Sequence, residues 1–459
     1  MQSKSLSKNF TEGNIPRQLL LFSLPFMASN AMQVLYSTID MIIVGQCVEP
    51  EAAALSAVSQ SSQIVNFVTM ICLGFSNAGQ VLIAQALGAQ KKKEMNHIMG
   101  TLFVFVSLLA LVLSAGILIA ANPILTVMNI KDPATRSMAM DYLTICGAGL
   151  IFTAGYNMVS AVLRGMGDAK RPFLFIAIAS VVNLVLDIVF TGFWGWGVAG
   201  AAWATIIGQA VSFLFSLFYL FRKRESFGFD FRLKSLMPVR KYVGMITSLG
   251  TPMAIQSGCI NLSMLFVNSM INTVGIFESA TFGVGIRIDD IISKISQGIQ
   301  YAAMPMISQN IGAGKQTRAK QVVWYAILIA GIFTVACMIL YLVFGNELFS
   351  IFSDDPEVHR RSGVFIKAIL WMFPAFAVMR GSGAFIQGIG NAKLSMVLAL
   401  LDGVILRIGL SWLFGIAFGW GFFGFVLGYA LAPYGFAIPA MIYFLLGKWK
   451  NRKTLAEEL

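Results

Sequence analysis

The chain has 459 residues, of which 57% are hydrophobic and 12% are charged, about half the charged fraction usual in a soluble domain. A mean hydropathy of +0.76 therefore indicates a protein that crosses the membrane several times. The net charge of +12 does not indicate a nucleic-acid partner, because the basic residues recur between apolar segments instead of gathering on one domain.

Twelve apolar segments are each long enough to cross a bilayer, which takes roughly 20 helical residues. Their approximate ranges are 18–47, 56–84, 99–122, 139–162, 172–191, 198–221, 243–272, 281–309, 321–345, 363–386, 394–418 and 422–446. The connections alternate in charge, and most lysines and arginines fall on the side that holds both ends of the chain. We therefore expect a multi-pass protein of the plasma (inner) membrane with both termini in the cytoplasm.

The chain repeats itself after about half its length. Arg164-Gly-Met-Gly-Asp-Ala-Lys170 recurs 223 residues later as Gln387-Gly-Ile-Gly-Asn-Ala-Lys393. We predict an all-α membrane protein with twelve transmembrane helices in two six-helix bundles, related by a pseudo-two-fold axis along the membrane normal. The bundles would cover 1–221 and 242–459, the second with a cytoplasmic tail, and 222–241 would be a cytoplasmic linker.

Span 5 carries an unusual polar pair. Asn183 and Asp187 lie four residues apart in an apolar helix, so they share one face. A carboxylate in hydrocarbon costs roughly 2.5–3.5 kcal/mol on insertion scales, and a bound cation or proton is the simplest compensation. A rise of about 1.5 Å per residue places Asp40 on span 1 and Thr205 on span 6 at a similar depth. These oxygen donors predict a site for Na⁺, or for protons on the two acids.

Each of these residues also has a structural interpretation. Asp187 could cap a neighbouring helix or pair with a basic residue, and Asp40 lies nearer a helix end, where charge costs less. Thr205 could simply bond the backbone of its own helix. Pro25 interrupts span 1, which also carries Asp40, so a bend there could be coupled to protonation; the alternative is a plain kink.

The second half does not repeat the acids. At the matching offsets, the four polar positions are occupied by Val267, Arg407, Ser411 and Tyr429. We therefore expect the cation site in the first half only. Arg287 and Asp290 on span 8, together with Arg407, could line a cavity. Alternatively, Arg287, Asp290 and Lys294 neutralise one another at helical spacing, with Asp289 facing elsewhere. Asp402, Arg407 and Arg380 in the second half have a structural pairing as their favoured interpretation.

No enzymatic chemistry is predicted. The five cysteines contain no CxxC pattern and the two histidines fall in polar segments, so this inventory cannot assemble a zinc or haem site. A nucleophile–base pair and a loop-borne acidic motif are also missing from the sequence. We expect a protein without a cofactor that is not an enzyme.

The pattern resembles the MATE family, the multidrug and toxic compound extrusion transporters. The resemblance covers the twelve spans and Leu163-Arg-Gly-Met-Gly-Asp-Ala; its most specific part is Asn183-x3-Asp187 followed by Gly195-Trp-Gly-Val-Ala-Gly-Ala-Ala and Thr205. Members of this family export organic cations in exchange for Na⁺ or H⁺. The resemblance implies that Asp40, Asn183, Asp187 and Thr205 form a first-bundle cation site, and that Pro25 matches the proline at which span 1 bends in some members.

The expected function is therefore cation-coupled antiport. H⁺ or Na⁺ would drive multidrug efflux of small organic cationic or amphipathic compounds, by a monomer in the lipid bilayer. The alternative is a lipid or lipid-linked oligosaccharide flippase of the same superfamily. Arg287, Arg380 and Arg407 would suit its anionic head group, because buried guanidinium groups bind phosphate well.

Overall fold

The computed structural model describes residues 8–227, 229 and 232–459, and all regular structure in these residues is helical. Eight of the described helices are long and apolar enough to cross a membrane, and two bent helix pairs bring the number to ten. The two remaining predicted spans correspond to α10 (Arg240–Asn272) and α11 (Ile276–Gly312), the second of which carries a charged stretch. The predicted all-α membrane fold is thus confirmed.

The chain forms two compact units. Unit 1 consists of Met1–Asn9 and Ala28–Ala254, and unit 2 consists of Phe10–Met27 and Ile255–Leu459. The predicted linker 222–241 falls in unit 1; its residues 228, 230 and 231 lie outside the described part of the chain.

Two helices are shared between the units. Helix α1 (Ile15–Cys47) contains Pro25 and passes from unit 2 to unit 1 two residues later. Helix α10 contains Pro252 and passes from unit 1 to unit 2, also two residues later. A proline removes one backbone hydrogen bond from the helix interior, so both helices are weakened next to the point where they change unit.

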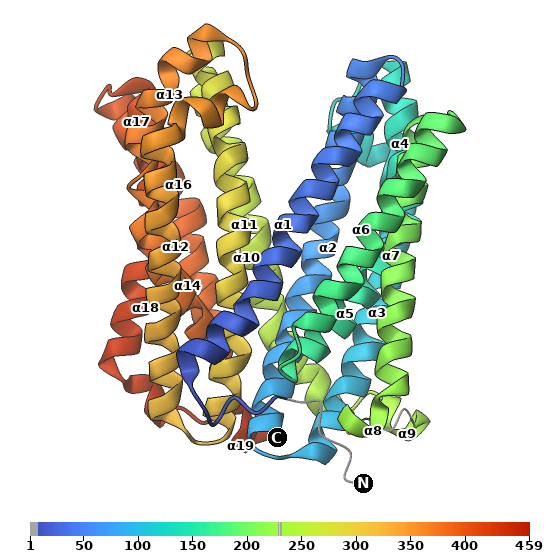
Figure 1. The fold of residues 1–459 in the computed structure, drawn as a ribbon, viewed down its shortest axis with the longest axis vertical. Coiled ribbons are helices and arrows are strands. Elements are labelled where there is room, and N and C mark those ends of the chain that lie inside the picture. The colour runs from blue at the N-terminus through green and yellow to red at the C-terminus, as the bar shows by residue number, and fades with distance from the viewer. Residues whose placement is uncertain (1–7, 228, 230–231) are drawn as a thin grey trace. The chain divides into compact units, whose positions relative to one another are not determined.

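Unit 1 contains the helices of the first repeat (Figure 1). They are α1, α2 (Glu51–Gly88), α3 (Lys92–Val127), α4 (Pro133–Ala148), α5 (Leu150–Gly165), α6 (Lys170–Asp187), the π-helical η1 (Ile188–Phe193) and α7 (Gly197–Arg222), followed by the short α8 (Arg224–Phe227) and α9 (Leu233–Leu236). Helix α2 packs against α4 and α5, and α6 packs against α7. Asp132 caps α4 by accepting a hydrogen bond of 2.8 Å from the backbone N–H of Thr135.

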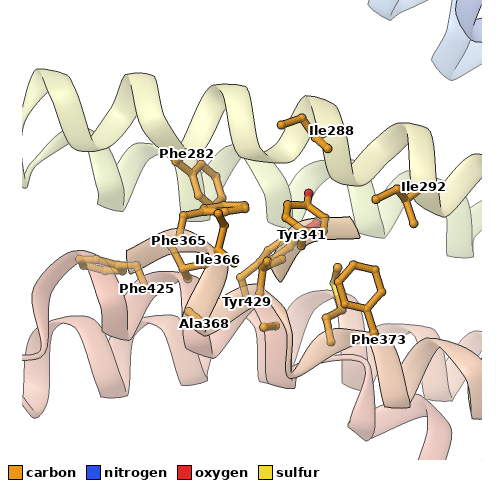
Figure 2. Close-up of a cluster of buried hydrophobic side chains, with 14 of the residues drawn as sticks. Phe282, Ile288, Ile292, Tyr341, Phe365, Ile366, Ala368, Phe373, Phe425 and Tyr429 are labelled. Atoms are coloured by element: carbon orange, nitrogen blue, oxygen red, sulfur yellow. The ribbon is translucent and has the colours of Figure 1, made fainter. Parts of the chain in front are cut away.

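Unit 2 contains the second repeat. Its helices are α11, α12 (Gln316–Ser350), α13 (Pro356–Ile369), α14 (Met372–Gly388), α15 (Ala392–Leu400), the π-helical η2 (Leu401–Leu406), α16 (Arg407–Trp412), the π-helical η3 (Leu413–Ala417), α17 (Gly421–Leu431) and α18 (Tyr434–Leu446), then η4 (Lys448–Asn451) and α19 (Leu455–Glu458). An apolar core of this unit lies between α10, α11, α12, α13, α14 and α17 (Figure 2).

The N-terminal segment is tied into unit 2 before α1 begins. The backbone N–H of Phe10 donates to Gln309 Oε1 at 3.1 Å, and the carbonyl of Phe10 accepts from Asn310 and Arg318. Lys315 Nζ donates to the carbonyl of Thr11 at 3.0 Å. These bonds explain why the first half of α1 belongs to unit 2.

The repeat extends to backbone conformation. The fourth span is bent in each unit, by 45° between α4 and α5 and by 47° between α13 and α14. Gly167 and its counterpart Gly390 both have left-handed φ angles, +86° and +78°, and so do Gly197 and Gly421, at +59° and +55°. Only glycine adopts these angles without a steric cost. The glycines therefore recur in the second half, although the acids do not.

Candidate functional site

The structure brings the two predicted acids of unit 1 together. Asp40 on α1 is 9% exposed and Asp187 at the end of α6 is 1% exposed. Their carboxyl groups lie within hydrogen-bonding reach of each other, and Asn183, 5% exposed, lies beside Asp187. The Oδ1 atom of each acid is buried without a hydrogen-bond partner. The pair therefore keeps free oxygen atoms that can bind a cation or a proton.

Local sequence explains how α6 presents its half of the site. Asn183 and Asp187 are one turn apart, so both side chains leave the helix on the side facing α1. On another side, Gly208 of α7 approaches α6: a Cβ at this position would lie 3.1 Å from both the carbonyl oxygen of Ala179 and Cβ of Asn183. The absence of a side chain at Gly208 lets α7 support the turn that carries Asn183.

Thr205 does not join the acids in this structure. It is half-buried on α7 and makes no hydrogen bond to Asp40, Asn183 or Asp187 among the described residues. Asp40, Asn183 and Asp187 are thus brought together, and Thr205 lies on α7, which packs against α6.

Tyrosines surround Asp40, which the sequence reading did not anticipate. Tyr36, one turn earlier on α1, and Tyr142 on α4 both interact electrostatically with Asp40, and Tyr142 contacts Cys146. Tyr156 on α5 interacts with Tyr36 and donates a hydrogen bond of 2.9 Å to the carbonyl of Pro172. Only Tyr36 carried a signal in the sequence, because its spacing of four from Asp40 predicts a shared helix face.

The site contains negative charge without a basic counterpart. Across the described residues, no lysine or arginine forms an ion pair with Asp40 or Asp187. Two carboxylates about 4 Å apart repel by roughly 4 kcal/mol at an effective dielectric constant of about 20. Both acids cannot be ionised together at this cost without compensation, so the pair requires a shared proton or a bound cation.

The donor set fits a hard monovalent cation as well as a proton. It consists of two carboxyl groups and an amide oxygen, with tyrosine hydroxyls nearby, and such oxygen ligands suit Na⁺. The described residues contain no cluster of three or more histidine, cysteine, aspartate or glutamate side chains.

The polar residues of unit 2 match the structural alternative in part. Arg287 and Asp290 are exposed, and Asp290 forms an ion pair of 2.7 Å with Lys294. The buried acid of this stretch is its neighbour Asp289, which is 3% exposed. Arg407 is 6% exposed and forms an ion pair of 3.1 Å with Asp402, as in the structural alternative.

Comparison with known proteins gives matches along the whole chain. The family model MatE matches residues 25–189 and 252–413. The probable multidrug resistance protein YpnP of Bacillus subtilis is 30% identical over 98% of this chain and 99% of its own length. The probable multidrug resistance protein NorM of Thermotoga maritima is 25% identical over 99% and 98% of the two chains. The multidrug export protein MepA of Staphylococcus haemolyticus is 24% identical over 97% and 96%.

Solved structures share the fold. An outward-facing multidrug resistance transporter of the MATE family and MOP superfamily matches with a TM-score of 0.92 at 22% identity, over 98% of this chain and 100% of its own. A MOP superfamily transporter from Pyrococcus furiosus, described as having a binding pocket of reverse polarity that suggests a different function, matches with a TM-score of 0.89 at 22% identity, over the same shares of the two chains. The fold is thus found with pockets of more than one polarity.

Proposed function

Because this chain belongs to the MatE family of membrane transporters, and its relatives are named as multidrug resistance and export proteins, we propose that it exports small organic cations in exchange for H⁺ or Na⁺. The proposed coupling site is the acid pair of unit 1. Asp40 and Asp187 carry the exchangeable charge, and Asn183 contributes a further oxygen atom. Thr205, on the neighbouring helix α7, is the fourth residue of the proposed site.

One observation carries this proposal: two buried carboxyl groups lie side by side and have no basic partner among the described residues. A structural acid is normally paired or hydrogen-bonded, because an unpaired buried charge is costly. Asp40 Oδ1 and Asp187 Oδ1 have no such partner. The pair is stable only when it holds a positive charge, and releasing that charge makes the site favourable for an organic cation.

The proposal links the site to movement through α1. This helix carries Asp40 in unit 1 and Pro25 in unit 2. Asp40 favours apolar surroundings when a cation neutralises it and hydrated surroundings when the cation has left. Cation exchange therefore acts directly on helix α1. Pro25 has no backbone N–H and leaves a weak point where α1 can bend.

The expected cytoplasmic termini and monomeric state belong to the same proposal.

The flippase alternative has less support. Arg380 is buried and already donates to Ser293 and Ser296, and Arg407 is paired with Asp402. Both guanidinium groups already donate to partners inside unit 2, so a lipid phosphate would have to displace those partners. Arg287, which is exposed, is the one of the three that remains available without such displacement.

Transport in proteoliposomes tests the proposal. Purified protein is reconstituted with a fluorescent organic cation, and a pH gradient and a Na⁺ gradient are imposed separately. We expect one gradient or both to drive export, and Asp187→Asn to reduce export to the level of empty liposomes. Asp141→Asn is the matched control, because Asp141 is an exposed acid of the same unit. Export by Asp187→Asn at the wild-type rate would refute the proposal.

A further inference from the structure

Unit 2 contains a second group of buried charges that the proposed coupling site does not use. Asp289 on α11 is 3% exposed, Arg380 on α14 is 4% exposed, Asp402 in η2 is 1% exposed and Arg407 on α16 is 6% exposed. Two of these side chains are acidic and two are basic. Charges buried inside an apolar core are rare and costly, so their arrangement indicates a function.

One acid and one arginine of this group neutralise each other. The π-helical geometry of η2 brings residues five apart onto one face, and Asp402 and Arg407 have this spacing. Their ion pair is 3.1 Å long, and the guanidinium of Arg407 lies over the ring of Tyr429 at 4.7 Å. The Nε atom of Arg407 remains buried without a hydrogen-bond partner.

The second arginine is held only by neutral groups. Arg380 donates to Ser293 Oγ at 2.9 Å, to the Ser293 carbonyl at 3.0 Å and to Ser296 Oγ at 3.1 Å. Within the described chain, no acid forms an ion pair with Arg380. Its charge therefore lacks a counterion in contact, and Asp289 is the remaining buried acid with which it interacts.

One carboxyl oxygen of Asp289 has no hydrogen-bond partner. Its Oδ1 atom is buried without a partner, and so is the hydroxyl of Tyr341, with which it interacts electrostatically. Tyr341 and Tyr429 lie in the apolar core of unit 2 (Figure 2). The titratable and charged groups that interact with Asp289 are Asp290 on its own helix, Cys337 and Tyr341 on α12, Arg380 on α14, Arg407 on α16 and Tyr429 on α17.

Two opposite influences act on this carboxyl group. Its burial in an apolar core favours the neutral, protonated form, and the two arginines favour the ionised form. With Asp289 ionised, the four buried charges sum to zero; with Asp289 protonated, the core of unit 2 carries one positive charge. A group under such opposed influences changes protonation state after a small change in its surroundings.

We propose that Asp289 is a proton-binding site of unit 2, separate from the acid pair of unit 1. The ligand is a proton and not a metal ion, because one bare carboxyl oxygen and one tyrosine hydroxyl cannot replace the hydration shell of Na⁺ beside two guanidinium groups. The inference goes beyond the proposed function, since it holds whether or not Asp40 and Asp187 couple transport.

Infrared difference spectroscopy of the full-length protein tests this site. The background is the Asp40→Asn, Asp187→Asn double variant, which removes the unit 1 carboxyls, and the pH is changed above the range in which exposed acids titrate. We expect one titrating band of a protonated carboxyl group. Asp289→Asn should remove this band completely, and Asp290→Asn, the matched control on the exposed neighbour, should leave it unchanged.

A conservative variant protects the test against misfolding. Asp289→Glu keeps a carboxyl group, so the band should persist at a shifted frequency, while Asp290→Glu should not move it. Gel filtration and thermal unfolding identify variants that have not folded. A band that neither Asp289→Asn nor Asp289→Glu alters, or its absence from the folded double variant, would overturn the inference. Normal transport by Asp187→Asn would instead refute only the unit 1 proposal.

Discussion

Replacing Gly208 by alanine separates the proposed site from the stability of the fold. The added Cβ would lie 3.1 Å from the carbonyl oxygen of Ala179 and from Cβ of Asn183, a few tenths of an ångström closer than normal contact. Overpacking of this small size costs about 1 kcal/mol. Removing a glycine from a helix interior gains about 0.5–1 kcal/mol. The free energy of unfolding should therefore stay almost unchanged.

The strain is nevertheless placed on the turn that presents Asn183. If about 1 kcal/mol of that strain opposes the bound state, the apparent affinity for the coupling cation falls about fivefold. The assay is initial exchange rate in proteoliposomes as a function of cation concentration, together with the thermal unfolding midpoint of the same preparation. The expected result for Gly208→Ala is a weaker apparent affinity at a nearly unchanged midpoint.

Gly331→Ala is the control for this experiment. Gly331 lies inside α12, and a Cβ there would meet nothing within 4 Å. The variant should raise stability by about 0.5–1 kcal/mol and leave the cation affinity unchanged. Wild-type affinity in Gly208→Ala would refute the reasoning, and so would a parallel loss of affinity in Gly331→Ala.

Three further predictions concern unit 2. Gly424→Ala should destabilise it by about 3 kcal/mol, because the new Cβ would lie 2.4 Å from a backbone oxygen; an unchanged unfolding midpoint would contradict this. Asp402→Asn should cost about 3 kcal/mol in denaturant unfolding, because Arg407 loses its buried partner, whereas a neutral effect would mean that another acid compensates. Arg361 donates a hydrogen bond to Glu278, which lies outside the predicted span, and this bond lowers the pKa of Glu278. The pair therefore stabilises the folded protein fully above the ordinary pKa of a glutamate, and this stabilisation is lost as the pH falls through the lowered pKa. In Glu278→Gln, the thermal unfolding midpoint should therefore fall less steeply at acidic pH than in the wild type.

Span 8 carries two neighbouring acids that the structure places on different faces of the helix. Asp289 and Asp290 are adjacent, and the sequence left open whether Asp290 lines a cavity or pairs with Arg287 and Lys294 while Asp289 faces elsewhere. The structure buries Asp289 and exposes Asp290 with Lys294. Adjacent residues point about 100° apart on a helix, and which of them faces inward depends on the helices packed around it. Periodicity in a helix that carries five charges on several faces does not fix this rotation.

The amino-acid sequence by itself determined the spans and the repeat, and it predicts a common depth for the acids. These follow from local quantities, namely the length of apolar runs, the glycines that permit left-handed turns and a constant rise per residue. Tertiary structure alone decided that Asp40 lies against Asp187, that Tyr142 of α4 lies near Asp40, and that α1 changes unit after Pro25. Such contacts depend on how each helix is rotated about its axis, and only packing against the other helices fixes that rotation.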